Sequence, residues 1–203
     1  RDLRKSLQHE AQQAGLDFGV AAGTMFLGPF ALSLDLARES ASLMYATVPV
    51  VQRLPLDAAC ITATCHQQTE LLLATPGDLT RVTSDLEQAM RVAIVRTGKN
   101  PGNAELRAEL PAVYREMIYL QQSATLPLTK TSVCEYPLPR FVVELKTLIQ
   151  SDANLSSKRR FRLETAVIDS TRNSKKSVFV PSDIHKGYGE GMYYQALVLI
   201  AQS

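Results

Sequence analysis

The stretch from Ile184 to Gln195, IHKGYGEGMYYQ, brings together residue types that can bind anions or move protons. Three glycines alternate with other residues in it, at Gly187, Gly189 and Gly191. Alternating glycines allow a wide loop, but the run fits neither a dinucleotide fingerprint nor a P-loop, because a strand pattern rather than a helix follows it. The stretch predicts an inter-strand loop. Two alternatives stay open: an anion site made by backbone amides with His185 and Lys186, and His185 as an acid/base with Lys186 or Arg160 stabilising negative charge.

Basic residues are concentrated in the last third of the chain. The strand pattern there brings strand ends together, which predicts one patch for nucleic acid or another anion, with tyrosines as stacking faces for single-stranded bases. The same charges also suit an exposed edge that keeps strands from aggregating, and both interpretations remain open. The candidate nucleic-acid or anion-binding residues are Arg140, Lys158, Arg159, Arg160, Arg162, Arg172, Lys175, Lys176, Lys186, Tyr188 and Tyr193.

Metal binding and covalent catalysis find little support. Cys60, Cys65 and His66 are close in sequence, but on a helix the two cysteines differ by about 140° and do not face one ion. No CxxC or HxxxH completes a tetrahedral site, and no GxSxG is present. Cys65 shares a helical face with Ala58 and Ile61, which favours a core position. We predict no catalytic residue, no metal site and no cofactor, although a triad assembled by folding is spatial rather than sequential.

The composition is that of a globular protein. The chain has 203 residues, of which 45% are hydrophobic and 21% charged, and its net charge is +2. This length suits one domain or two small ones. Three cysteines, an odd number, favour a reducing intracellular compartment, the cytoplasm or nucleus or the interior of a virion. Because the chain begins with Arg1, we expect a fragment or a processed product.

The uncharged run from Phe18 to Leu34 raises the question of membranes. A spanning helix needs roughly 20 apolar residues, and this run is shorter and holds glycines and Pro29. It predicts a buried helix broken near Gly28 and Pro29. The alternative is a hairpin that touches a membrane or docks a partner.

Helical periodicity dominates the first part of the chain. Helices are predicted over residues 3–14, 38–47, 56–74 and 77–97, the last capped by Thr75, and a further one from about 103 to 117 with a kink or break at Pro111. From Ser123 a segment with several prolines reads as an extended connector.

Four alternating segments follow the connector, over residues 141–149, 160–169, 178–180 and 192–201. Alternation of this length, divided by polar turns, predicts strands, and short links predict an antiparallel meander. The expected fold is α+β: an N-terminal helical subdomain followed by a C-terminal four-stranded antiparallel β meander. The expected domains are a helical subdomain at 1–122, the connector at 123–139 and an antiparallel β subdomain at 140–203.

Two stretches resemble the matrix protein of orthomyxoviruses. DAACITATCHQ, residues 57–67, is similar to that family's alanine-rich helix ending in a Cys-Ala-Thr-Cys sequence, with Cys65 at the second cysteine. EQAMRVAIVRTGKNPGNAELRAELPAVYREM, residues 87–117, resembles a late segment of the family. The spacing between the stretches is shorter than in the family, a terminal β meander is foreign to it, and its histidines have no counterpart here. The resemblance implies a non-enzymatic shell protein that self-associates and touches membrane and ribonucleoprotein.

These observations favour a non-catalytic structural or assembly protein, of viral shell, matrix or nucleocapsid type, that forms homo-oligomers. It would contact single-stranded RNA or another acidic partner through the basic β surface. One alternative is an enzyme or binding module for phosphate-containing ligands that uses the loop from His185 to Gly191. The other is a membrane-associated module that uses residues 18–34.

Overall fold

A computed structural model of the chain describes residues 2–74, 78–101, 105–123, 136–152, 154, 159–167, 171 and 175–201. The chain divides into two compact units. The first comprises Arg1–Thr75 and Pro181–Gly191, and the second comprises Pro76–Val180 and Met192–Ser203. The segment Pro181–Gly191, late in the sequence, therefore belongs to the same unit as the first 75 residues.

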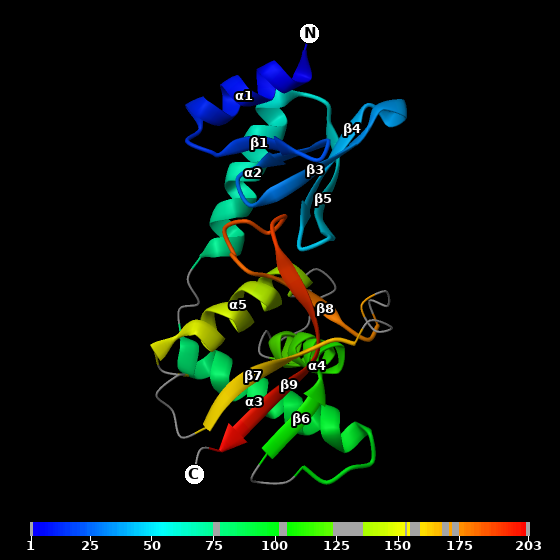
Figure 1. Cartoon of the computed structure of the whole chain (residues 1–203), viewed down its shortest axis with the longest axis vertical. Coiled ribbons are helices and arrows are strands. Elements are labelled where there is room, and N and C mark those ends of the chain that lie inside the picture. Colours follow the sequence, from blue (N-terminus) through cyan, green and yellow to red (C-terminus); the bar gives the residue numbers. More distant parts are fainter. Residues whose placement is uncertain are drawn as a thin grey trace. The chain divides into compact units, whose positions relative to one another are not determined.

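The first unit is a five-stranded antiparallel sheet with two helices. The chain runs through α1 (Leu3–Gln13), β1 (Phe18–Ala21), β2 (Thr24–Leu27), β3 (Phe30–Asp35), the 3₁₀ turn η1 (Leu36–Arg38), β4 (Ser40–Tyr45), β5 (Val48–Pro55) and α2 (Ala58–Leu73). The strands lie side by side in the order of the sequence, each antiparallel to the next. In Figure 1 this unit runs from blue to cyan-green.

Both predicted helices within residues 18–47 are wrong, because this region forms the sheet. In β4, Ala41, Leu43 and Tyr45 are buried and alternate with more exposed residues, which is the two-residue period of a strand. The turn between β4 and β5 is closed by Ala46 and Thr47, both with positive φ. Such a turn usually contains Asn-Gly or Asp-Gly. Neither dipeptide is present here, so the sequence did not predict this hairpin.

The helices of the first unit confirm the sequence patterns. Leu7 and Ala11 of α1 are fully buried, and Gly15 follows the helix with a φ of 67°. In α2, Ile61 and Cys65 lie on the buried face, as predicted. Asp57 caps α2 by accepting a hydrogen bond from the Cys60 N–H at 2.8 Å, a common way to satisfy a free amide at a helix start.

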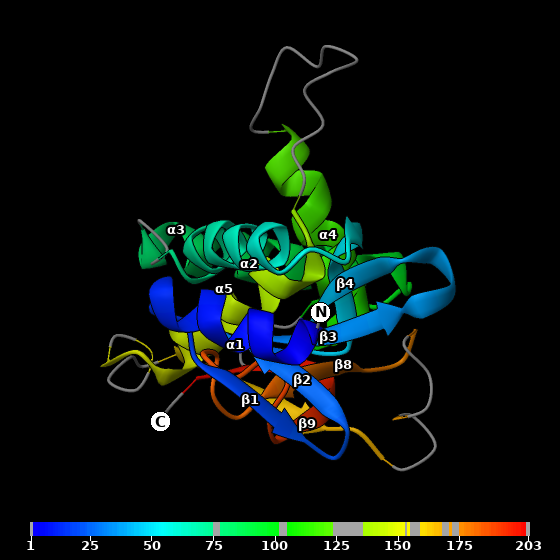
Figure 2. The ribbon, with the colours of Figure 1, turned by 90° about the horizontal axis from the view of Figure 1, so that it is seen from above.

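The second unit is a four-stranded sheet packed with helices. Its elements are α3 (Leu79–Arg96), β6 (Glu105–Glu109), α4 (Leu110–Ser123), α5 (Leu138–Gln150), β7 (Arg159–Thr165), β8 (Val178–Pro181) and β9 (Gly191–Ala201). The last strand, β9, is central: β6 and β7 pair with its two sides, and β8 pairs with it as well. Figure 2 shows α3 and α4 on one side of β9, so the helices form a separate layer on the sheet.

The α+β class is confirmed, but the predicted four-stranded meander is wrong. Three of its segments are strands, whereas residues 141–149 belong to α5. Phe141, Leu145 and Leu148 of α5 are all buried, and their spacing of four and three residues fits a helix as well as the alternation fits a strand. The fourth strand is β6, where the sequence predicted part of a helix, and Pro111 lies in the first turn of α4 rather than at a kink.

Helix α3 agrees with the sequence pattern except at its cap. Leu86, Ala89 and Ala93 are buried, and ion pairs form between Arg81 and Asp85 and between Arg91 and Glu87, at 3.6 and 2.8 Å. The cap is Asp78, which accepts hydrogen bonds from the N–H groups of two residues in the first turn. The predicted cap Thr75 and residues 124–135 of the predicted connector lie outside the described residues.

Candidate functional site

The four-stranded sheet of the second unit has one face that the helices cover and one that carries charges. Leu106, Ala108 and Phe161 are buried on the helix side. Alternate residues point the other way, and paired residues of antiparallel strands share a face. We call this second face the open face. It holds Glu105, Arg107 and Glu109 of β6, Ala196, Val198 and Ile200 of β9, and Arg160, Arg162 and Glu164 of β7.

The strand register places these residues in three rows across the sheet. Glu105 and Arg160 flank Ile200, Arg107 and Arg162 flank Val198, and Glu109 and Glu164 flank Ala196. The Arg107 Nε lies 2.8 Å from the Glu164 Oε2, so an ion pair joins the two outer strands across β9. Val198 and Ala196 lie between these two strands and are 0% and 1% exposed, and the long charged side chains beside them help to cover the apolar strip.

The remaining charges of the open face are separated by sign. Glu105 and Glu109 are exposed on β6, and Arg160 and Arg162 are exposed on β7. Together with the Arg107–Glu164 pair, the six formal charges of this face cancel. At these strand positions the formal charge is therefore zero, with an acidic side on β6 and a basic side on β7.

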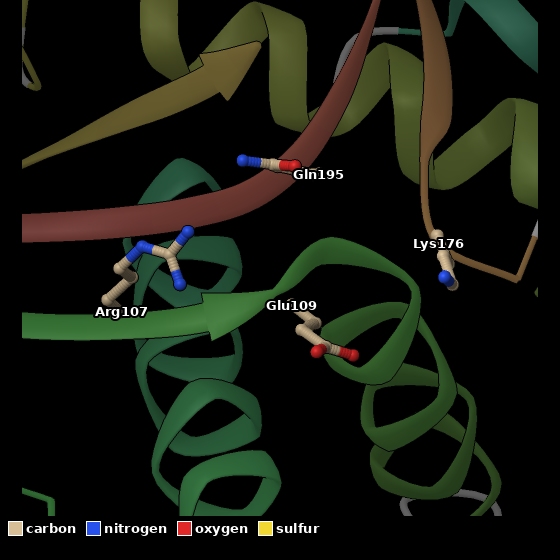
Figure 3. A pocket seen from close by; sticks show the side chains of 4 residues that line it. All are labelled: Arg107, Glu109, Lys176 and Gln195. Carbon is tan, nitrogen blue, oxygen red and sulfur yellow. The ribbon is translucent and has the colours of Figure 1, made fainter. Parts of the chain in front are cut away.

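A cavity lies where β6 ends and the chain approaches β8. It has a volume of about 340 Å³ and is lined by Arg107, Glu109, Lys176 and Gln195. Figure 3 shows that these side chains come from three segments, β6, β9 and the stretch before β8, around one hollow. Two cationic side chains, a carboxylate and an amide thus face one space.

A β-bulge positions Gln195 at this cavity. Glu164 of β7 pairs with Ala196 and the next residue, Thr165, pairs with Tyr194, so the register skips Gln195. A bulge residue leaves the regular ladder, and its side chain takes a direction that an unbroken strand would not allow. Gln195 is half-buried there, with its amide available to a bound group.

The glycine-rich stretch that begins at Ile184 is an ordered loop of the first unit. The Tyr45 hydroxyl donates a hydrogen bond to the Ile184 carbonyl at 3.0 Å, and the Ala46 N–H donates to the Gly187 carbonyl at 2.9 Å. Tyr188 stacks on Phe26 with ring centroids 3.9 Å apart. The loop thus holds the strained turn between β4 and β5, which agrees with the sequence prediction of a loop between strands.

Burial controls the ionisation of two groups in the core of the first unit. Tyr45 is fully buried, and its burial, helped by the negative charge of Asp183, raises the pKa of the Tyr45 hydroxyl well above its usual value. Burial likewise raises the pKa of the Cys65 thiol to about 12, although a hydrogen bond with Thr69 acts the other way. Both groups are neutral hydrogen-bonding groups of the core.

The structure separates the predicted anion-binding residues into different places. Lys186 and Tyr188 belong to the first unit, and Tyr188 uses its ring on Phe26. Arg160, Arg162, Lys175 and Lys176 are exposed in the second unit. Tyr193 packs edge-on against Phe179, with centroids 5.2 Å apart. Lys158 and Arg172 lie outside the described residues.

Two of the predicted arginines make internal ion pairs. The Arg159 Nη1 lies 3.0 Å from the Glu87 Oε1, which links β7 to α3. Partial burial raises the pKa of Glu87, but hydrogen bonds and charges of Arg91 and Arg159 outweigh it and leave the pKa below its ordinary value. Arg140 hydrogen-bonds Glu144 at 2.6 Å and lines a different cavity of about 290 Å³.

All three histidines belong to the first unit. His9 makes a hydrogen bond with Gln13 on α1, His66 lies 3.8 Å from Glu70 on α2, and His185 is exposed in the loop of the first unit. Within the described part of the chain, no group of three or more metal-ligating side chains is present. Among the helices with described residues, none is both long enough and apolar enough to cross a membrane.

No protein family, no curated protein and no solved structure matches this chain. The resemblance to orthomyxovirus matrix proteins therefore stays a prediction, and the arguments that follow rest on the geometry of the chain itself.

Of the described residues that line the cavity, sequence reasoning missed Arg107, Glu109 and Gln195. Residues 105–109, ELRAE, do alternate between charged and apolar side chains, which is a strand signal. This strand signal is short, and it lies within the helix that was predicted from about residue 103 to 117. The bulge at Gln195 depends on the register of two strands that are about 30 residues apart in the chain, and a single segment carries no sign of it.

Proposed function

We propose that this chain is a non-catalytic structural protein that self-associates through the open face of its four-stranded sheet, the β6 side of one copy meeting the β7 side of another. The observation that carries the proposal is the separation of charge on that face: Glu105 and Glu109 on β6, Arg160 and Arg162 on β7. A surface with an acidic and a basic side is complementary to a second copy of itself.

Charge pairing of this kind sets partner choice and orientation more than raw affinity. The apolar atoms of Ile200, which is half-buried between Glu105 and Arg160, would supply area that a partner can cover. Association of exposed charges weakens as salt rises. The expected oligomer is therefore favoured at low ionic strength and at high protein concentration.

The mixed charge favours a second copy over nucleic acid as the occupant. The open face carries three glutamates as well as three arginines, and the glutamates would repel a phosphate backbone. Tyr188 and Tyr193, which could have stacked on bases, pack on Phe26 and Phe179. Single-stranded RNA remains the competing occupant that the experiment must separate.

The experiment is a charge exchange followed by analytical ultracentrifugation over a series of concentrations and salts. The double change Glu105→Arg with Glu109→Arg makes the β6 side basic, and the double change Arg160→Glu with Arg162→Glu makes the β7 side acidic. Each variant alone should lose self-association, because both sides then repel each other, and a mixture of the two should recover a complex. Reversing Arg4 and Lys5 on α1, both exposed, alters the total charge of the first unit and should leave assembly unchanged.

A chain that stays monomeric at its highest soluble concentration in low salt would refute the proposal. So would equal assembly by the wild type and both reversed variants. Fluorescence anisotropy with labelled single-stranded RNA supplies the other arm. If the wild type bound RNA and the Arg160→Glu, Arg162→Glu variant did not, the basic side would belong to nucleic acid rather than to a second copy.

A further inference from the structure

We infer that the cavity lined by Arg107, Glu109, Lys176 and Gln195 binds a small zwitterion of the amino-acid class. Its volume, about 340 Å³, falls in the range of small-molecule sites, which runs from about 300 to 1,000 Å³. It shares Arg107 and Glu109 with the open face, so binding is measured at a protein concentration and salt at which ultracentrifugation shows the chain to be monomeric.

The lining offers both charges that a zwitterion requires. Glu109 and Lys176 are exposed side chains at the cavity, and neither takes part in an ion pair with another of the described residues. Lys176 presents three donors and no acceptor, whereas Glu109, ionised, presents acceptors only. Lys176 therefore suits the carboxylate of a zwitterion, and Glu109 suits its ammonium group.

Arg107 adds a second, fixed cation. Its Nε contacts Glu164 at 2.8 Å, and a guanidinium has five N–H donors in a rigid fork. The Glu164 contact uses one edge of the group and holds its plane, which leaves terminal N–H groups for a ligand. An arginine oriented in this way by a carboxylate is a common means of holding a second carboxylate.

Gln195 completes the polar lining with a group that both donates and accepts. Its amide can hydrogen-bond to a carboxylate or to an ammonium, and the bulge in β9 carries it to the cavity. Bulges occur often beside functional sites because they redirect single side chains.

A smaller hollow of about 100 Å³ shares Arg107 and Glu109 with this cavity. Its other described lining residues are Ala93, Ile94, Thr97, Lys99, Ala108 and Ala112. The apolar side chains among them lie next to Arg107 and Glu109 and fit a short aliphatic group. The ligand class is therefore an amino acid with a small apolar side chain.

The test is isothermal titration calorimetry of the full chain with L-alanine and L-valine. Each is compared with its N-acetyl derivative, which lacks the ammonium, and with its methyl ester, which lacks the carboxylate. At least one free amino acid should bind, and both derivatives should bind at least about tenfold more weakly, the effect of losing one charge-assisted hydrogen bond.

Variants separate the cavity from general effects of charge. Lys176→Met and Glu109→Gln should each weaken binding by about tenfold or more, and Lys176→Met should bring the affinity of the free amino acid close to that of its ester. Lys175→Met removes the same charge one residue away, outside the lining, and should bind as the wild type does. Circular dichroism confirms that each variant is folded.

The inference is overturned if neither amino acid binds. It is also overturned if the derivatives bind as well as the parent compounds, or if Lys175→Met weakens binding as much as Lys176→Met does.

Discussion

Replacing Gly187 by alanine should undo the loop that closes the first unit. The added methyl group would overlap the ring of Tyr45, and Tyr45 is fully buried and cannot yield. Forcing an extra carbon into a packed site costs about 1–3 kcal/mol. The alternative is that the loop lifts away.

Lifting the loop breaks a defined set of contacts. The hydrogen bonds from Tyr45 to Ile184 and from Ala46 to Gly187, at 3.0 and 2.9 Å, would be lost, at about 0.5–1.5 kcal/mol each. The stacking of Tyr188 on Phe26 would be lost too, at about 0.5–1.5 kcal/mol. The chain follows the less costly of the two routes, so the expected loss of unfolding free energy is about 1–3 kcal/mol.

Urea unfolding of the full chain, followed by circular dichroism, measures this loss. Gly19→Ala is the matched control, because an added methyl there meets nothing within 4 Å and the glycine has no positive φ. Hydrogen exchange of the β4–β5 turn should speed up in Gly187→Ala and stay unchanged in Gly19→Ala.

A double-mutant cycle tests the stated cause. If Tyr45 is the obstacle, Gly187→Ala should cost clearly less in a Tyr45→Leu background, in which the smaller side chain leaves room. The reasoning fails if Gly187→Ala is no more harmful than Gly19→Ala, or if the cost is the same with and without the Tyr45 ring.

Two further predictions follow from the shifted pKa values. Cys65 is fully buried, and burial raises its pKa to about 12, so at pH 8 roughly one Cys65 thiol in ten thousand is ionised and it should resist alkylation in the folded chain. Half-buried Cys60 should be alkylated before Cys65. Peptide mass spectrometry measures both, and equal labelling of the two would contradict the burial of Cys65. Glu87→Gln should destabilise the second unit by about 1 kcal/mol at pH 7, because the pKa of Glu87 is lower in the folded chain than in the unfolded chain. The ionised Glu87 carboxylate therefore stabilises the fold above its unfolded-state pKa, and this stabilisation is lost as the pH falls through its folded-state pKa. Thermal unfolding of wild type and variant should therefore converge in acid, and a difference that persisted there would exclude the ionised carboxylate as its source.

The helices α1, α2 and α3 were predictable because each has an apolar stripe of helical period that a single partner surface buries. Cys65 illustrates the point: its helical spacing from Ala58 and Ile61 predicted a core position, and it is buried. Strands β7, β8 and β9 were predictable from alternation for the same local reason. The α+β class follows from these elements alone.

The sequence was a poor guide where one pattern fits two periods or where a turn lacks its usual residues. Phe141, Val143 and Leu145 alternate like a strand, yet Phe141, Leu145 and Leu148 form the stripe by which α5 is buried. The turn at Ala46 and Thr47 is held in positive φ by a loop that comes from more than a hundred residues later. Neither outcome can be read from a local window, because long-range packing selects it.

The same division applies to the sites. Arg160, Arg162 and Lys176 were recognisable as exposed cations from the sequence, since they are charged residues in or next to alternating segments. Their partners were decided by the tertiary structure alone. The central place of β9 brings Arg107 diagonally within reach of Glu164 and leaves the remaining glutamates on β6 and the remaining arginines on β7. The bulge in the β7–β9 register leaves Gln195 at the cavity. Sequence composition determines which charges exist, whereas strand order and register determine which of them meet, because side chains from distant segments become neighbours only when the sheet forms.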